Sequence, residues 1–249
     1  MRSTFRQTTC FTLVITLIAS CFVQAAHAGP FSISPVRIYM APRDRAIAVT
    51  ITNEGNEELV MQADLYNWMQ KDNGEDELTL TEDMIMSPPI LKLAPRSKQV
   101  VRLAMLRPRP PGEQLTYRMI VREIPEAKPA TDNDLKLQIA LAFSMPVFIT
   151  PRGAKYKVAC QFERTGAETA KANCENTGNA YTQVRSMVLN NAAGASLASS
   201  TISGGYMLLG AKRSFELKSA GGKIPAGNAK LMLTHDDGTS QIFDVTVAE

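Results

Sequence analysis

The longest alternation of apolar and polar positions runs from residue 135 to residue 145, at the start of the stretch LKLQIALAFSMPVFITP. A period of two over eleven residues predicts a β-strand with one apolar face, about 36 Å long at roughly 3.3 Å per residue. Pro146 has no N–H to give to a neighbouring strand, which favours an edge position or a bulge. A long apolar edge strand is an aggregation hazard, so the sequence raises the question of what covers it. The apolar face comprises Leu135, Leu137, Ile139, Leu141, Phe143 and Met145.

The rest of the first half also follows strand patterns. Turn signals separate the runs, and Asn73-Gly74 suits a hairpin. Eight prolines between residues 88 and 129 leave little room for a helix, and Ser87-Pro88-Pro89 is a candidate for a cis bond. Short strands with turns at intervals of about 8–12 residues predict an immunoglobulin-like β-sandwich. The expected strands are 47–53, 58–70, 91–93, 100–105 and 116–124.

The second half is a separate unit of short strands. Thr150-Pro151-Arg152-Gly153 marks the boundary, because a pre-proline residue and a glycine both interrupt strands. Beyond it the chain is richer in Gly, Ala and Ser, and Asp236-Asp237-Gly238 is a turn signal. We expect a smaller, looser β-sandwich, so the fold class is all-β with two immunoglobulin-like domains in tandem. The expected strands of the second domain are 156–162, 181–189, 206–209, 214–217, 230–233 and 241–247.

The N-terminus has the pattern of a secretory signal peptide. Arg2 and Arg6 precede an apolar stretch and the small-residue pattern Ala26-His27-Ala28, so we expect cleavage after residue 28. A lipoprotein site at Cys21 is the alternative, although apolar residues directly after the cysteine are unusual for a lipid-anchored tether. No later run is long enough to span a membrane. The expected domains are 29–151 and 152–249, and each has the usual domain size of about 100 residues.

Charge and cysteine usage narrow the class further. Removing two signal-peptide arginines lowers the 27 basic residues to 25 against 24 acidic ones, so no nucleic-acid footprint is present. Export leaves Cys160 and Cys174 in an oxidising compartment, where two cysteines are expected to form one disulfide. A metal site is the weaker alternative, because only one histidine accompanies them.

Catalytic chemistry has little support. His235 is the only mature histidine and lies beside a turn, which favours a surface or hairpin residue over a catalytic one. Asp236 and Asp237 fit a turn, and the acidic residues at 72–76 lack the spacing of a calcium loop. No glycine-rich loop precedes a helix. We expect no enzyme activity, no cofactor and no metal, and a function carried by a surface.

Four stretches of the first half resemble the periplasmic pilus-assembly chaperones that partner outer-membrane ushers. They are FSISPVRIY (31–39), SPP (87–89) running through to VRL (101–103), YRMIVREIP (117–125) and LQIAL (137–141). The resemblance implies a non-enzymatic periplasmic chaperone that binds, folds and caps pilus subunits and hands them to the usher. It covers nearly the whole mature chain, although the second domain matches weakly. Whether the free protein caps itself by dimerising stays open.

The resemblance explains the long edge strand. Subunits of such pili are sandwiches that lack a strand, and the chaperone's strand fills the gap by donor-strand complementation. Leu137, Ile139 and Leu141 are then the central plugs, with Leu135, Phe143 and Met145 extending the row. The alternative from the pattern alone is that this face packs against its own sheet.

The family also binds the subunit's C-terminal carboxylate with a basic pair, an Arg on the first strand and a Lys on the donor strand. Arg37 matches the Arg, but Pro146 occupies the lysine position. This departure suggests the branch that assembles spore-coat-like pilins, with Arg118 of the Tyr117-Arg118 pair as the second anchor. Arg102 and Arg122 are expected to be structural, pairing with Glu123 near the domain junction.

A competing function is a secreted adhesion or carbohydrate-binding sandwich, because a fold does not fix a function. Sugar-binding sites need clustered aromatic residues, and this chain has one tryptophan, Trp68. The alternating row at 135–145 therefore favours the chaperone hypothesis.

Overall fold

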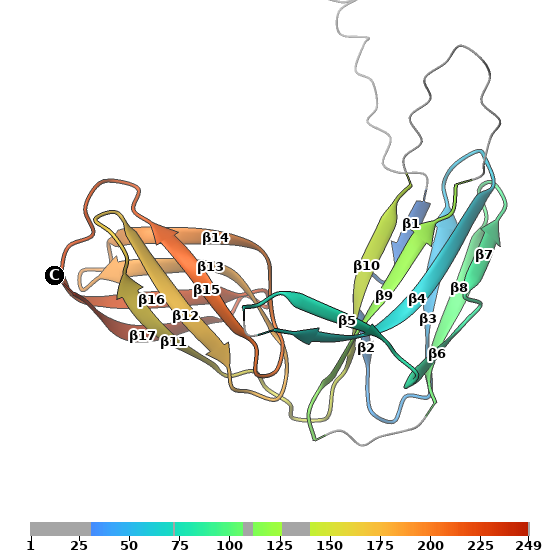
Figure 1. Cartoon of the computed structure of the whole chain (residues 1–249), viewed down its shortest axis with the longest axis horizontal. Coiled ribbons are helices and arrows are strands. Elements are labelled where there is room, and N and C mark those ends of the chain that lie inside the picture. Colours follow the sequence, from blue (N-terminus) through green and yellow to red (C-terminus); the bar gives the residue numbers. More distant parts are fainter. Residues whose placement is uncertain (1–30, 72, 107–111, 126–139, 249) are drawn as a thin grey trace, which may run out of the picture.

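The computed structural model describes residues 31–71, 73–106, 112–125 and 140–248, and these residues form β-strands and connecting turns (Figure 1). The strands build two domains in tandem, one from residues up to Ile149 and one from Val158 onward. This confirms the predicted fold class. The expected boundary at 151/152 lies in the strand-free connection between them and stays a prediction. Within the described ranges, no helix long and apolar enough to cross a membrane is found.

The first domain is a sandwich of two sheets. One sheet has the order β1-β3-β8-β6, from β1 (Phe31–Ser34), β3 (Ala46–Asn53), β8 (Lys98–Met105) and β6 (Met84–Ser87). The other has the order β2-β10-β9-β4-β5, with β7 also paired to β4; these strands are β2 (Ile38–Met40), β10 (Ala142–Ile149), β9 (Leu115–Glu123), β4 (Leu59–Gln70), β5 (Asp76–Leu80) and β7 (Ile90–Leu93).

The core lies between these sheets and follows the alternation of the sequence. On β9, Tyr117, Met119 and Val121 point inward and are buried, whereas their neighbours are partly exposed. Burying one such side chain fully is worth about 1.5–3 kcal/mol. The expected strands at 47–53, 58–70, 91–93, 100–105 and 116–124 correspond to β3, β4, β7, β8 and β9.

Strand β10 holds the described part of the long apolar row. It pairs with β9 from Ala142 to Ile149, but with β2 only over Val147–Ile149. Among the described residues, β10 is therefore an edge strand up to Pro146, the position at which the missing N–H predicted an edge. Residues 135–139, where the alternation begins, lie outside the described ranges.

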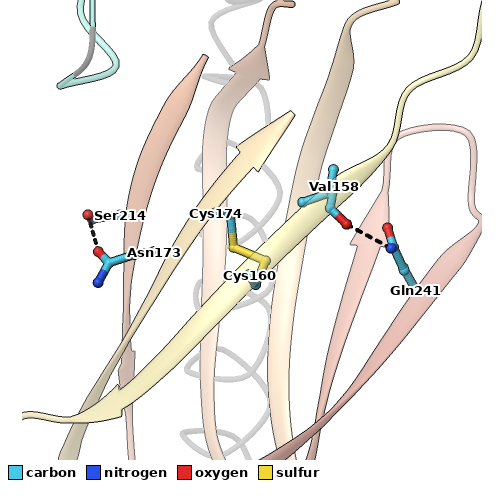
Figure 2. Close-up of a disulfide and its surroundings, with 6 residues drawn as sticks. All are labelled: Val158, Cys160, Asn173, Cys174, Ser214 and Gln241. Atoms are coloured by element: carbon cyan, nitrogen blue, oxygen red, sulfur yellow. Dashed lines mark hydrogen bonds between the residues drawn. A yellow bond between two sulfur atoms is a disulfide. The ribbon is translucent and has the colours of Figure 1, made fainter. Parts of the chain in front are cut away.

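The second domain is a single sheet of seven strands wrapped around its own core. The order is β11-β12-β15-β14-β13-β16-β17. One pair, Ser199 with Lys218, joins β14 to β15, so the sheet divides there into two layers. The outer strands approach each other where the Gln241 amide donates to the Val158 carbonyl oxygen at 2.9 Å (Figure 2). The strands are β11 (Val158–Arg164), β12 (Thr169–Asn176), β13 (Thr182–Asn191), β14 (Ser196–Met207), β15 (Lys212–Lys218), β16 (Gly227–His235) and β17 (Ser240–Val247).

Two predicted local features are present. The Ser87–Pro88 bond is cis, as is Ser34–Pro35, which the sequence analysis did not single out. Gly74 has a φ of 81° in the turn between β4 and β5, a conformation that glycine adopts without a steric penalty. The expected hairpin turn at Asn73-Gly74 is therefore confirmed.

The disulfide joins two neighbouring strands of the second domain. Cys160 on β11 lies directly opposite Cys174 on β12, with the Cα atoms 4.1 Å apart (Figure 2). Strand β12 was not predicted, because its inward side chains are the small Ala170, Ala172 and Cys174 and the polar Asn176, which give no strong apolar alternation. The expected pairing of the two cysteines is present in the structure.

Replacing both cysteines with alanine should lower the free energy of unfolding by about 2–4 kcal/mol, because the loop that the bond closes restricts the unfolded chain. Urea denaturation of the oxidised wild type and of the double variant measures this difference. Mass spectrometry of the unreduced wild type should find no free thiol at Cys160 or Cys174. Two free thiols would contradict the pairing.

Candidate functional site

Aromatic side chains from both domains gather at the domain junction. Phe148 of β10 stacks on Tyr181, with ring centroids 3.8 Å apart, and Trp68 of β4 meets Tyr206 of β14 edge-on at 5.3 Å. Trp68 and Phe148 are fully buried. A tryptophan in this position is not available to stack on a sugar ring, which removes the one aromatic residue considered for a carbohydrate site.

Polar contacts also tie the domains together. The β4–β5 hairpin extends from the first domain toward the second (Figure 1), and its Gln70 side chain accepts from Leu208 N at 2.9 Å. Gln114 accepts from Tyr181 N at 2.8 Å. Gly74 at the hairpin turn lies so close to Arg213 that an added Cβ would be 2.9 Å from its Cγ. These contacts join the two domains at several separate points.

Arg37 lies at this junction, in the bend between β1 and β2. Its Nη1 donates to Asp236 Oδ2 at 2.7 Å and its Nη2 to Gln183 Oε1 at 2.8 Å. Both partners belong to the second domain. Burial alone would lower the pKa of Arg37, but the hydrogen bonds to Asp236 and Tyr39 outweigh it and raise the pKa. The guanidinium is therefore a fixed positive charge that spans the junction.

Arg118 reaches the same region from β9. In the β9–β10 pairing it lies directly opposite Pro146, the position where the resemblance places a lysine. Its guanidinium carbon is 3.7 Å from the centroid of the Trp68 ring, and its Nη2 is 3.3 Å from Asp76 Oδ2. Burial lowers the pKa of Arg118 more than the negative charge of Asp76 raises it.

The structure thus brings the two candidate anchors together. The guanidinium carbons of Arg37 and Arg118 both lie within 6 Å of the Tyr206 ring centroid, at 5.8 Å and 5.5 Å. Strand β9, which carries Arg118, pairs directly with β10. The role of either arginine as a carboxylate anchor stays a prediction.

The described members of the apolar row differ in exposure. Met145 is 3% exposed in the core of the first domain, and Leu141 is half-buried against that core. Phe143 is 41% exposed and packs edge-on against Phe31, with centroids 5.0 Å apart. The residues near Pro146 therefore help to hold their own domain. Leu135, Leu137 and Ile139 lie outside the described residues.

Arg122 has a different partner from the expected one. It bonds to Asp64 and to the Tyr66 hydroxyl, not to Glu123. Neighbouring residues of a strand point to opposite faces, so Arg122 shares a face with Asp64 on the paired strand β4, whereas Glu123 bonds to the backbone of Leu141. The expected position near the domain junction is also wrong, because Glu123 lies at the other end of β9, about 26 Å from Leu115 at roughly 3.3 Å per residue. Arg102 is exposed on β8.

His235 is a hairpin residue, as expected, but not a surface one. It ends β16, is 2% exposed and lies 4.4 Å from the Tyr156 ring, between ring centroids. Nδ1 is 2.6 Å from Thr182 Oγ1, and Nε2 is buried with no hydrogen-bond partner among the described residues. Packing against Tyr156 encloses the ring, which the sequence position did not reveal. In the described part of the chain, no group of three or more His, Cys, Asp or Glu side chains is arranged to hold a metal ion.

Lowering the pH from about 7.5 to about 5.5 should destabilise the protein through His235. Burial lowers the pKa of the folded-state ring below its usual value of about 6.5, against the opposing charges of Asp237 and Asp236. As the pH falls, the unfolded state therefore binds the proton before the folded state does. The contribution of His235 to the free energy of unfolding is complete above about pH 6.5 and is lost as the pH falls toward the folded-state pKa. The loss is at most about 1.4 kcal/mol per pH unit. Urea denaturation should show a weaker pH dependence for His235→Asn. An equal dependence in both proteins would contradict this assignment.

Most partners of the two arginines could not be predicted from the sequence. Asp236 was identified as a turn residue, which it is, but not as the ion-pair partner of Arg37, 199 residues earlier in the chain. Nothing in the sequence identified Asp76, Gln183 or Tyr206 as neighbours of these arginines. Their contacts depend on how the two domains pack together, and no local pattern encodes that packing.

Comparison with known proteins finds similarity to chaperones of pilus assembly. Residues 30–155 match the sequence model of the family described as "Pili and flagellar-assembly chaperone, PapD N-terminal domain". The Chaperone protein LpfB of Salmonella typhimurium is 26% identical over 152 residues, and the Probable fimbrial chaperone LpfB of Escherichia coli O157:H7 is 26% identical over 144 residues. The matches cover 60% and 57% of this chain and 60% and 59% of the relatives, so the chain spans about three fifths of their length.

Solved structures share the two-domain fold. A chain in the CsuC–CsuE chaperone–tip adhesion subunit pre-assembly complex from the archaic chaperone-usher Csu pili of Acinetobacter baumannii has a TM-score of 0.62 at 19% identity, covering 88% of this chain and 99% of its own. A chain in the complex of the Salmonella enterica SafA pilin with the SafB chaperone has a TM-score of 0.55 at 14% identity, with coverages of 89% and 98%. At such low sequence identities, these TM-scores show that the proteins share a fold and show nothing further.

Proposed function

The chain belongs to the family of pili and flagellar-assembly chaperones, and on that premise we propose that it binds, folds and caps pilus subunits by donor-strand complementation and delivers them to an outer-membrane usher. The proposal includes export to the periplasm with cleavage of the signal peptide at residues 1–28. The alternating row at 135–145 has the pattern that this function needs, and the open edge of β10 is the single observation that carries the proposal.

The edge of β10 supports strand addition. From Ala142 to Pro146 the strand has a partner on one side only among the described residues, so backbone N–H and C=O groups face outward for a subunit strand to pair with. Leu135, Leu137, Ile139 and Leu141 would then enter the open core of the subunit. Phe143, which is partly exposed, would extend the row, while Met145 serves the chaperone's own core.

Arg37 and Arg118 are proposed to hold the C-terminal carboxylate of the subunit. A planar guanidinium binds a carboxylate through two parallel hydrogen bonds, and such pairs are stronger where water is partly excluded. Arg118 lies opposite Pro146, so it can place a positive charge close to where the resemblance expects a lysine. This arrangement supports the proposal that the chain belongs to the branch of the family that assembles spore-coat-like pilins.

Co-expression with small secreted proteins that are candidate pilus subunits tests the proposed function. The expected result is a one-to-one complex with one of them, in which the partner is soluble and folded only together with this chain. A matched variant with a charge in the row, Leu137→Asp, should give no complex. If no partner forms a complex with the wild type, or if the variant forms it equally well, donor-strand capture is wrong.

A further inference from the structure

Both candidate carboxylate anchors already hold a carboxylate in the free protein. Arg37 is paired with Asp236 at 2.7 Å and Arg118 with Asp76 at 3.3 Å. The terminal carboxylate of a subunit has the same chemistry as these side chains. A subunit that binds Arg37 through the same nitrogen must therefore displace Asp236.

We propose that Asp236 is an intramolecular stand-in for the subunit's terminal carboxylate, which holds Arg37 in position until the subunit replaces it. The inference rests on the proposed function, since it concerns the same site. When a subunit is captured, its terminal carboxylate then replaces the Asp236 carboxylate, while the Arg37 guanidinium stays in place. Asp236 is a positioning residue that also competes with the subunit.

The geometry allows this exchange without leaving a buried charge unpaired. Gln183 still accepts from Nη2 when Asp236 leaves Nη1, so the Arg37 side chain keeps its bond to Gln183. Asp236 N donates to the Gln183 carbonyl oxygen, a bond that fixes the turn independently of the carboxylate. A rotation of the Asp236 side chain alone can therefore release Arg37.

The released carboxylate also has a place to go. Asp236 lines a cavity of about 500 Å³ at the domain junction, together with Asp237, Gln114 and Tyr181. A cavity of that size admits water, which can solvate the carboxylate after exchange. The side chains of Arg37 and Asp236 are 29% and 16% exposed, so the pair is partly dry but within reach of an incoming group.

The ion pair should reduce the apparent affinity for subunits. When a site is open only part of the time, its apparent dissociation constant rises in proportion, so a pair closed nine-tenths of the time weakens capture about tenfold. The second pair should have a smaller effect. Asp76 is 41% exposed, and the Trp68 ring supports the Arg118 guanidinium whether or not Asp76 is bound.

Asp236→Asn tests the proposal, because asparagine keeps the turn but removes the competing charge. The secreted protein that copurifies in the co-expression experiment serves as the probe, prepared with a free and with an amidated C-terminus. We expect the variant to bind the free-acid form about 3–10 times more tightly than the wild type does and the amidated form with unchanged affinity. Asp237→Asn is the matched control in the same turn. The Asp237 carboxylate accepts from Thr239 and Tyr156 and does not contact Arg37, so this variant should bind both forms of the probe with the affinity of the wild type.

Weaker or unchanged binding of the free acid to Asp236→Asn would show that Asp236 only supports the junction and would overturn the proposal. Equal tightening of both forms would also overturn it, because the gain would not come from the carboxylate. Asp236→Ser, which keeps a turn-forming side chain, repeats the test if the first variant folds poorly. Failure of the proposed function looks different, because the wild type would then bind neither form. A wild type that bound both forms equally would show that no carboxylate anchor operates, which would overturn the role of Asp236 but leave donor-strand capture intact.

Discussion

Ile139→Asp should abolish subunit capture while leaving the isolated chaperone folded. A plug side chain contributes about 1.5–3 kcal/mol when it is buried in the subunit, and an aspartate would also have to give up its hydration without a partner. Binding should therefore weaken by more than about 100-fold, since about 1.4 kcal/mol corresponds to a factor of ten. The free energy of unfolding of the free chaperone should change by less than about 0.5 kcal/mol, as for an exposed site. Copurification measures the first quantity and urea denaturation the second.

Met145→Asp is the matched control within the same row. Met145 is 3% exposed in the core of the first domain, so a charge there should unfold the domain and abolish capture together. If Ile139→Asp behaves like Met145→Asp and loses stability and binding equally, Ile139 packs inside its own domain. That result would remove Ile139 from the donor row.

Arg37→Ala and Arg118→Ala should each weaken capture of an intact subunit by about 2–5 kcal/mol, because each leaves a partly buried carboxylate without one of its partners. If both arginines hold one carboxylate, their effects should not add, and the double variant should lose less than the sum of the single losses. Calorimetric titration of the four proteins completes the cycle. Neither substitution should further weaken capture of a subunit with an amidated C-terminus.

Arg122→Ala controls for the loss of an arginine from β9. Arg122 is paired with Asp64 away from the junction, so its removal should leave capture normal. Normal binding by Arg118→Ala together with failure of Arg37→Ala would mean that another group replaces the missing lysine. Normal binding by both would mean that the apolar row alone holds the subunit.

The sequence determined the fold class and most of the strands. Alternation on β9 and β3 gave their inward faces, because a half-buried strand must place its apolar side chains on one side. The disulfide also followed from the sequence, since two cysteines in a chain that is expected to be exported have few other fates. Strand β12 and the buried His235 did not, because alanines make a weak pattern and a single polar residue gives no burial signal.

The resemblance supplied Arg37 and Arg118 as candidates. Only the tertiary structure decided what surrounds them. Arg37 pairs with a residue 199 positions away, and Arg118 lies near the rings of Trp68 and Tyr206, which belong to different domains. Such contacts depend on the packing of two separately folding units, and a periodic pattern records only which face of a strand is buried, not what it is buried against.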